Sequence, residues 1–540
     1  MKTQSGHYPA VAMATVAPPR AAPPRALQDL GARIKALPRP VLVGAGLIAL
    51  LALSVYLRTR QFGVGFWTDE GISVGIAGHK LSAIPGLMRQ DGSPPLYYIL
   101  LHFWMEWFGS TEQDTHALSL LFALLCIPVG LWAGWSLWGE RAGWITAVLM
   151  ATNTFVDVYA QETRMYSLVA LEGLVLSAAF LHTYVYRRRR YAPLFGVALA
   201  LMLYTHNWGL FVGAGCVLAL IPCWRALDAE HRRPFIRDAV IGFGLAGLLY
   251  IPWLPTLAFQ AAHTGAPWTN APNFGVPIVF ARSILGGGAA TGAALLGAGY
   301  GVFIVIRQRR GDGLAARAAL WLGLGTLAVN YVLSQISPAF NPRYLAAVVG
   351  ITLLLGALGL ARAGRFGIVA LVAVALLWIN PTAHDVDNKS NAREVALELN
   401  PTLRPGDLVI VGEPEMVPLY RYYLTPGVRW ASELGATPDA GVFDWRDAVK
   451  RLTAATVSND LEPLLATVAP GQQVVYVRPI TSIGTNWNAP WTELVRRRAA
   501  QWGAALSTDP RLVRVASAPQ YYRPGASDIA EHAVVYVKKS

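Results

Sequence analysis

The chain has 540 residues, of which 54% are hydrophobic and only 14% are charged, and its mean hydropathy is +0.39. A soluble protein carries about 25% charged residues, so this composition excludes a disordered chain, a collagen-like chain and a typical cytosolic enzyme. The net charge of +13 would suit nucleic-acid binding, but most basic residues before the C-terminal region flank apolar runs. We therefore expect no nucleic-acid partner.

Residues 1–38 form a leader rich in Pro, Ala and Arg, which predicts a disordered cytoplasmic tail. The first apolar run begins too far along the chain for a cleaved signal peptide. A membrane span needs roughly 20 apolar residues. Eleven runs approach that length and are predicted to span a membrane: 41–57, 116–137, 143–159, 167–186, 191–205, 208–223, 239–257, 289–306, 318–336, 343–361 and 366–380.

Arginines indicate the orientation of this predicted transmembrane domain, residues 39–380. Cytoplasmic loops of membrane proteins carry an excess of Lys and Arg. That excess falls on one side, in the leader, in the arginine run 187–190 and among residues 307–317, if the N-terminus is cytoplasmic. An odd number of spans then places residues 381–540 outside the cytoplasm, and we expect a multi-pass protein of a bacterial inner membrane in contact with its lipids.

Residues 381–540 contain short β-like runs at 407–412, 473–478 and 533–538, with a helical stretch near 391–399. This alternation predicts a small α/β domain. Its aromatic residues, including Trp445 and Trp491, either offer stacking surfaces for sugars or form the core of that domain. The predicted fold is thus a polytopic α-helical membrane protein with about eleven transmembrane helices and a small extracytoplasmic α/β domain.

The first outer loop, about 58–115, is too long for a simple connector. It carries the runs 67–71 (WTDEG) and 91–98 (DGSPPLYY), separated by an amphipathic stretch at 72–88. Such a stretch predicts interfacial helices that lie along the membrane surface.

Three further junctions between spans carry polar residues on the same predicted face. Singly, each is explained as a helix cap or an interfacial ion pair, but ionisable residues at membrane depth are functional candidates. Their one-sided placement therefore predicts a polar site at the outer face. The junction residues are Asp157, Gln161, Glu162, Arg164 and Tyr166, then Tyr204, Thr205, His206 and Asn207, then Asn341, Pro342, Arg343 and Tyr344.

This set of side chains suits group transfer from a lipid phosphate. A carboxylate general base can activate an acceptor hydroxyl. Arginine or a metal ion can hold an anionic phosphate leaving group. A lipid-linked substrate would enter sideways from the outer leaflet.

Six motifs in order, over residues 40–380, resemble a known enzyme family: TDEGIS, DGSPPLYYILLHFW, AQETRMYSL, YTHNWGLF, YIPWLPTLAFQ and NPRYLAAVVGI. The series resembles bacterial membrane glycosyltransferases of the C-type superfamily, related to protein O-mannosyltransferases and the lipid A aminoarabinose transferase (glycosyltransferase family 39-like). The resemblance implies inverting transfer of a sugar from a polyprenyl-phosphate donor to an acceptor hydroxyl on the extracytoplasmic face. The acceptor is a glycan, a lipid or a protein.

The resemblance implies that Asp69 is the catalytic carboxylate, with Glu70 beside it as in the Asp-Glu pair of the mannosyltransferases. Our hypothesis is that Asp69 takes the proton of the acceptor hydroxyl. Glu70 shares that role or caps the following helix through the helix dipole. Asp91 binds the acceptor or a metal, or caps the Pro-rich turn.

The remaining candidates bind substrate. Arg164 and Arg343 hold the lipid phosphate, or pair with Glu162 or with carbonyls at helix ends. His206 is a metal or phosphate partner, or a histidine hydrogen-bonded at a helix end. Tyr97, Gln161, Glu162, Tyr166 and Tyr344 complete the set of substrate-binding candidates.

A divalent metal ion is a candidate cofactor, with Asp91 and His206 as candidate ligands. Many members of the resembled family carry histidine before the paired prolines, where this chain has Ser93. That difference weakens the case for a metal at this turn.

Two other classes of protein fit parts of the pattern. A transporter or flippase of a lipid-linked sugar would also hold polar residues between helices, but near the bilayer midplane and often in inverted repeats. A surface-binding protein would depend mainly on residues 385–540.

Overall fold

The computed structural model describes residues 38–379, 389–481, 488–520 and 529–540. The predicted leader, 1–38, lies outside these residues except for Pro38. Contacts divide the chain into two compact units, Met1–Ala49 and Leu50–Ser540. The described part of the first unit is the beginning of helix α2 (Arg39–Arg58).

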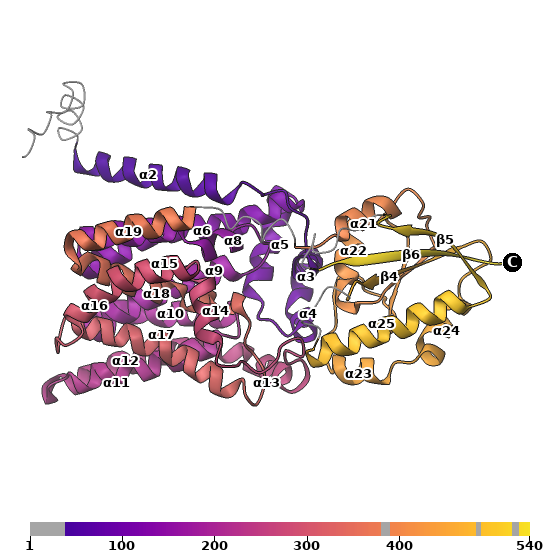
Figure 1. Cartoon of the computed structure of the whole chain (residues 1–540). Helices are drawn as coiled ribbons and strands as arrows, with labels where there is room; N and C mark the ends of the chain where they lie inside the picture. Colours follow the sequence, from indigo (N-terminus) through magenta and orange to yellow (C-terminus); the bar gives the residue numbers. More distant parts are fainter. Residues whose placement is uncertain (1–37, 380–388, 482–487, 521–528) are drawn as a thin grey trace, which may run out of the picture. The chain divides into compact units, whose positions relative to one another are not determined.

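Apolar helices make up most of the second unit before residue 380. Within a membrane, backbone polar groups must be satisfied inside the segment, which favours helices for runs of this composition. The helices pack side by side (Figure 1). They are α6 (Glu112–Trp138), α7 (Glu140–Thr152), α8 (Thr154–Tyr159), α9 (Tyr166–Phe180), η2 (Leu181–Val185), η3 (Arg189–Tyr191), α10 (Ala192–Thr205), α11 (Gly209–Arg225), α12 (Ala229–Tyr250), η4 (Ile251–Trp253), α13 (Leu254–His263), α14 (Val276–Ser283), α15 (Gly288–Ala294), η5 (Leu295–Gly299), α16 (Tyr300–Val305), α17 (Asp312–Leu333), η6 (Pro342–Leu345), α18 (Ala346–Arg362) and α19 (Gly364–Ile379).

Among the described residues, 7 helices are long and apolar enough to cross a membrane. Each predicted apolar run contains helix, but some helices are shorter than a full span, so the count of eleven stays a prediction. The seven are Arg39–Arg58, Glu112–Trp138, Tyr166–Val185, Ala229–His263, Gly288–Val305, Asp312–Leu333 and Pro342–Arg362, and the shorter apolar helices are Gly209–Arg225 and Gly364–Ile379.

Helices α9 and α18 form the buried centre of the bundle, with most of their residues shielded from solvent. Gly350 allows their backbones to approach closely, because a Cβ atom there would lie 2.4 Å from the backbone nitrogen of Leu174. Small residues at helix interfaces are typical of membrane bundles. This packing fixes the ends of both helices, where candidate site residues lie.

Short helices follow α2 in the predicted first outer loop. They carry the two motifs of that loop, and the structure places a helix over most of the predicted interfacial stretch. Gly92, with φ of 91°, ends α4 in the left-handed conformation that glycine adopts readily. The elements are α3 (Thr68–Ala77), η1 (Leu81–Ala83), α4 (Ile84–Asp91) and α5 (Leu96–Phe108).

Residues after 389 form a six-stranded mixed sheet in the order β3-β2-β1-β4-β6-β5. Strand β1 (Leu408–Val411) pairs in parallel with β2 (Arg429–Ser432) and β4 (Gln473–Pro479), with Val409 opposite Val475. Strand β6 (Glu531–Lys538) is antiparallel to β4 and to β5 (Leu512–Ala518), and β3 (Gly435–Ala436) is antiparallel to β2. The predicted small α/β domain is confirmed, as are its three predicted strands.

Alternating side chains of the central strands pack on two helical layers. Val409 and Val411 lie in one core with α21 and α22, whereas Leu408 and Ile410 lie in another with α24 and α25. This alternation is the period of two expected of a strand buried on both faces. The helices of the domain are α21 (Ala392–Leu399), η7 (Pro414–Met416), α22 (Val417–Tyr423), α23 (Ala448–Ala454), η8 (Val457–Leu461), α24 (Glu462–Ala466) and α25 (Pro490–Thr508).

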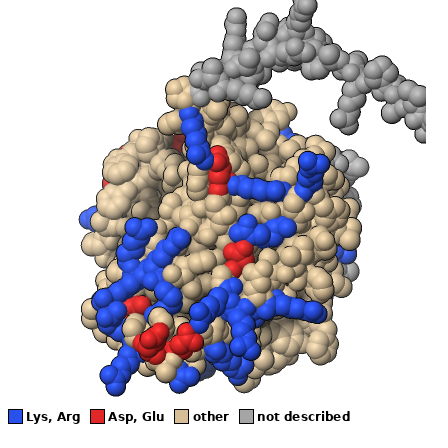
Figure 2. Space-filling model, turned by 90° about the vertical axis from the view of Figure 1, so that its left-hand side faces the viewer, with Lys and Arg blue, Asp and Glu red and all other residues tan. Residues whose placement is uncertain are grey.

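Basic side chains gather on one face of the helical bundle. Figure 2 shows Lys and Arg over much of that face, with few Asp and Glu among them. Two arginines of the run 187–190 pair with an acid, since Arg187 and Arg189 lie 3.8 and 3.5 Å from carboxylate oxygens of Asp238. An excess of Lys and Arg is what the positive-inside rule expects of a cytoplasmic face.

Candidate functional site

A cavity of about 380 Å³ lies among the short helices of the first outer loop, the predicted outer ends of the bundle helices and the sheet domain. Six of the predicted site residues line it, namely Asp69, Asp91, Arg164, His206, Arg343 and Tyr344. Glu70, Tyr97, Gln161, Glu162 and Tyr166 are not among its lining residues. Four separate stretches of chain therefore meet at one cavity.

Asp69 lies between two arginines in the first turn of α3. Its Oδ2 atom is 3.0 Å from Nη1 of Arg343 and 3.7 Å from Nη2 of Arg164. The side chain remains 20% exposed, and it lines the cavity. The carboxylate is therefore balanced by charge on one side and accessible from the cavity on the other.

The two arginines have hydrogen-bonding capacity left over. Nη1 of Arg164 donates to Oγ of Ser73 at 2.9 Å and to the hydroxyl of Tyr98 at 3.3 Å. The guanidinium of Arg343 lies 4.9 Å from the ring centroid of Trp67.

The Nε atoms of both arginines are buried without a hydrogen-bond partner. Guanidinium groups of this kind suit the oxygens of a phosphate. Among the described residues, Arg164 and Arg343 form their ion pairs with Asp69, and not with Glu162, which was the predicted alternative.

Aromatic rings surround His206 beside these arginines. Its ring centroid lies 4.7 Å from that of Tyr344 and 6.1 Å from that of Tyr166. The backbone N–H of Trp208 donates to Nδ1 of His206 at 3.1 Å, as expected of a histidine at a helix end. Burial, with a smaller effect from Arg164 and Arg343, lowers the pKa of His206 to about 3. The neutral ring therefore carries its proton on Nε2 and can donate it to an oxygen.

Asp91 occupies another part of the cavity wall, at the end of α4. The hydroxyl of Tyr98 donates to its Oδ2 atom at 3.4 Å, and burial raises its pKa. The adjoining turn is held from two sides, because Asn207 donates to the carbonyl of Gly92 at 3.0 Å and Gln260 donates to that of Ser93 at 3.1 Å. The turn is thus a fixed part of the wall.

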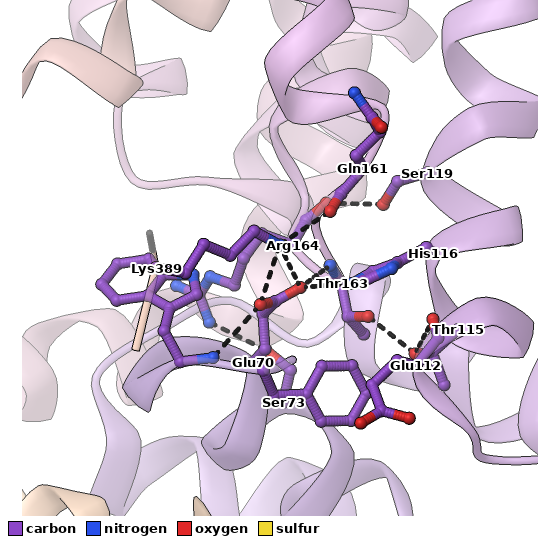
Figure 3. Close-up of polar contacts among 12 residues, drawn as sticks. Glu70, Ser73, Glu112, Thr115, His116, Ser119, Gln161, Thr163, Arg164 and Lys389 are labelled. Atoms are coloured by element: carbon purple, nitrogen blue, oxygen red, sulfur yellow. Dashed lines mark hydrogen bonds and ion pairs between the residues drawn. The ribbon is translucent and has the colours of Figure 1, made fainter. Parts of the chain in front are cut away.

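Glu70 is enclosed among polar partners (Figure 3). Its neighbour Asp69 lines the cavity instead. Its Oε1 atom accepts from Nε2 of His116 at 2.8 Å and from the backbone N–H of Thr163 at 2.7 Å. Nζ of Lys389 lies 3.1 Å from Oε2. Burial would raise the pKa of Glu70, but Lys389 and His116 together lower it below its usual value.

This network favours a positioning role for Glu70. The backbone N–H of Trp67 also donates to Oε2 at 3.3 Å, so Glu70 caps α3. One carboxylate thereby ties together α3, α6, the loop before α9 and the start of the sheet domain. The capping interpretation of Glu70 agrees with this geometry.

The other predicted residues lie behind the cavity wall. The backbone carbonyl of Gln161 accepts from Nζ of Lys389 at 2.7 Å. Burial raises the pKa of Glu162, whose Oε2 atom has no hydrogen-bond partner. The hydroxyl of Tyr97 lies 3.4 Å from Oγ of Ser119, and Tyr166 is buried against His206.

Several lining residues were not predicted as site residues: Trp67, Trp208, Gln260, Trp268, Glu413 and Glu415, whereas Trp445, which also lines the cavity, was a predicted candidate for stacking on a sugar. Trp67 immediately precedes the acidic pair, which is a local signal. Glu413 and Glu415 follow a predicted strand, and ligands of α/β sheets often bind at the carboxyl ends of strands. Trp208 and Gln260 lie within the motifs of the resemblance but carry no distinctive charge pattern.

The candidate metal ligands do not form a metal site. The described residues contain no group of three or more His, Cys, Asp or Glu side chains that could hold an ion. Nδ1 of His206 already accepts a hydrogen bond, which leaves Nε2 protonated. Among the described residues, Asp91 and His206 thus belong to no metal-binding group, and the proposed reaction uses no metal ion.

No protein-family model matches the chain, and no curated protein matches it in sequence. The fold is similar to that of several solved structures. ArnT from Cupriavidus metallidurans bound to undecaprenyl phosphate aligns with a TM-score of 0.60 at 14% identity, covering 92% of this chain and 98% of that one. The apo form of the same protein gives 0.59 at 15% identity, covering 91% and 97%.

Two more distant structures share the architecture. The Archaeoglobus fulgidus oligosaccharyltransferase in complex with Zn and sulfate aligns with a TM-score of 0.52 at 15% identity, covering 84% of this chain and 70% of that one. The arabinofuranosyltransferase AftD from Mycobacteria gives 0.52 at 15% identity, covering 94% of this chain and 40% of AftD. The chain therefore shares its fold with these solved structures.

Proposed function

We propose that the chain is an inverting membrane glycosyltransferase that moves a sugar from a polyprenyl-phosphate donor to an acceptor hydroxyl. The proposal depends on one observation: Asp69 lines the cavity and forms ion pairs with Arg164 and Arg343. A carboxylate next to spare guanidinium donors supplies both a base and a phosphate-binding group. The ArnT structure with undecaprenyl phosphate supports a lipid-phosphate ligand for this fold.

The proposed reaction is a single displacement at the anomeric carbon. The acceptor oxygen forms the new bond to that carbon while its proton passes to Asp69. The bond between the anomeric carbon and the phosphate oxygen breaks, and the phosphate leaves with the electron pair. Arg164 and Arg343 then hold the phosphate charge in place of the charge of Asp69. Protonated Nε2 of His206 is a further donor near the phosphate.

Orientation in the membrane is part of the proposal. The basic face of the bundle faces the cytoplasm of a bacterial cell, in accordance with the positive-inside rule (Figure 2). Residues 39–380 form the transmembrane glycosyltransferase domain with about eleven spans, and residues 381–540 form an extracytoplasmic domain. The cavity then opens to the extracytoplasmic side, where the acceptor hydroxyl of a glycan, a lipid or a protein arrives.

The direct test is to incubate the purified protein with a panel of polyprenyl-phosphate sugars and cell-envelope extracts, then measure released polyprenyl phosphate and product by mass spectrometry. Asp69→Asn should lower the transfer rate by about 10²- to 10⁴-fold, the usual contribution of a general base. The matched control is Asp228→Asn, because Asp228 is exposed and pairs with Arg310 away from the cavity. Near-normal turnover of Asp69→Asn, or no transfer from any donor, contradicts the proposal.

A further inference from the structure

Four buried glutamates gather at one edge of the sheet. Glu413 follows β1 and Glu433 follows β2, and both strands are parallel. Glu531 begins the antiparallel strand β6, opposite Pro479 at the end of β4. Glu413 and Glu415 are each 6% exposed, and only these two of the four line the cavity. They form the wall that the sheet domain contributes to it.

One oxygen of each of these two carboxyl groups lacks a partner. Oε2 of Glu413 and Oε2 of Glu415 are buried without a hydrogen bond, and the described residues provide neither with an ion pair to Lys or Arg. Thr68 and Gln260 also line the cavity, are 6% and 3% exposed, and leave Oγ1 and Oε1 unpartnered. Buried polar atoms without partners are costly, so their clustering around a cavity points to a ligand that supplies hydrogen bonds.

Aromatic rings complete the wall. The rings of Trp268 and Trp445 line the cavity with centroids 4.4 Å apart. Nε1 of Trp491 donates to Oε1 of Glu415 at 2.5 Å, which fixes the carboxyl group. A polar group beside flat apolar faces suits a sugar ring, since its hydroxyls can bond to the carboxyl oxygens while its C–H face rests on the rings.

Charge restricts the ligand further. Asp69, Asp91, Glu413 and Glu415 share the cavity, and none of the described residues that line its sheet-domain wall is basic, so an anionic group at that wall has no charged partner. Burial raises the pKa of Glu415 well above its usual range, and nearby Glu413 and Asp69 add to that rise. An oxygen of either carboxyl group can accept a hydrogen bond from a sugar hydroxyl.

We propose that Glu413 and Glu415, together with Trp268 and Trp445, form a subsite for a neutral, hydroxyl-rich sugar ring. The assignment of that ring to the donor or to the acceptor rests on the proposed glycosyl transfer. The binding of a neutral sugar does not.

The first test measures binding alone, with the full-length protein in detergent. Saturation-transfer-difference NMR would use methyl α-mannopyranoside, methyl α-glucopyranoside and methyl α-arabinofuranoside as neutral probes, and methyl α-glucuronide as an anionic one. We expect at least one neutral glycoside to bind and the glucuronide not to bind. The double variant Glu413→Gln/Glu415→Gln should weaken binding about tenfold, the effect of one or two hydrogen bonds.

Glu433→Gln is the matched control. Glu433 belongs to the same buried group, accepts from the hydroxyl of Tyr476 at 3.1 Å and does not line the cavity. Its variant should bind the neutral glycosides as the unmodified protein does. Absence of binding by every neutral glycoside, equal binding by the double variant, or equal binding of the glucuronide overturns the subsite.

The second test separates this inference from the proposed function. With the donor identified by the panel, a rise in KM for the donor alone assigns the subsite to the donor sugar, and a rise for the acceptor alone assigns it to the acceptor. If no donor is used but glycoside binding still depends on the two glutamates, glycosyl transfer is refuted and the subsite stands. If transfer proceeds and the double variant changes neither KM, the subsite is refuted and glycosyl transfer stands.

Discussion

The contact between Lys389 and Glu70 makes a sharp test of how the sheet domain supports the site. Nζ of Lys389 lies 3.2 and 3.1 Å from the two carboxylate oxygens of Glu70, and the side chains are 5% and 0% exposed (Figure 3). Lys389→Met removes the charge but keeps much of the side-chain volume. Glu70 then remains a buried carboxylate with its ammonium partner missing.

Breaking a buried ion pair by removing one partner costs about 3–5 kcal/mol. For a cooperative unit of 150–250 residues, about the size of the sheet domain, each kcal/mol lowers Tm by about 2–4 °C, so we expect a fall of roughly 6–20 °C. The assay is thermal unfolding of the purified protein in detergent, followed by tryptophan fluorescence. Transfer activity should fall as well, because Glu70 caps the helix that carries Asp69.

Two comparison variants make the reasoning refutable. Lys450→Met changes an exposed lysine of the same domain and should alter the free energy of unfolding by no more than about 0.5 kcal/mol. Glu70→Gln/Lys389→Met removes both charges and should recover much of the lost stability. Equal Tm values for Lys389→Met and Lys450→Met, or a double variant no more stable than Lys389→Met, would refute the ion-pair argument.

Three further predictions test the phosphate site, the acidic cluster and the bundle core. Arg343→Gln should weaken binding of undecaprenyl phosphate about 10- to 100-fold, because charge-assisted hydrogen bonds contribute about 1.5–3 kcal/mol. Thermophoresis measures this affinity, and an unchanged value would exclude Arg343 from the phosphate site. Burial raises the pKa of Glu433 and of Glu531 to about 8. The folded state therefore binds these protons more tightly than the unfolded state does, and the stability of the fold should fall as pH rises from about 4.3 to 8. Glu433→Gln should reduce this fall in Tm, and an identical pH profile would contradict the assignment. Gly350→Ala places a Cβ atom 2.4 Å from the backbone nitrogen of Leu174. The variant should destabilise the bundle by about 1–3 kcal/mol, measured by thermal unfolding. An unchanged Tm would show that α9 and α18 can move apart at no cost in stability.

The sequence predicts the helical segments well because apolar runs of this length have few alternatives within a membrane. It fails where one polar residue interrupts such a run. The predicted span 143–159 is two helices in the structure, α7 and α8. Asn153 divides them: its side chain accepts from the backbone N–H of Val156 at 3.2 Å and donates to the carbonyl of Ile284 at 2.9 Å. Asparagine is a common N-cap, so the signal was present in the sequence.

Some features of the candidate site can likewise be predicted from the local sequence, whereas others depend on residues that lie far apart in the chain. Motif position predicts that Asp69, Arg164 and Arg343 approach one another, because the ends of successive spans return to the same membrane face. Motif position does not show which of Asp69 and Glu70 faces the cavity, although the side chains of adjacent helical residues point about 100° apart. The partner that enforces the difference, Lys389, is 319 residues from Glu70, and no local pattern connects them.

The sheet domain therefore contributes to the cavity in two physically different ways. Lys389 stabilises Glu70 and, through α3, the position of Asp69, whereas Glu413 and Glu415 form part of the cavity wall. Deletion of the domain removes both contributions together, so loss of transfer after deletion follows from either. The point variants separate them. Lys389→Met should lower Tm and kcat together, whereas Glu413→Gln/Glu415→Gln relieves repulsion between buried acids and should raise KM without lowering Tm.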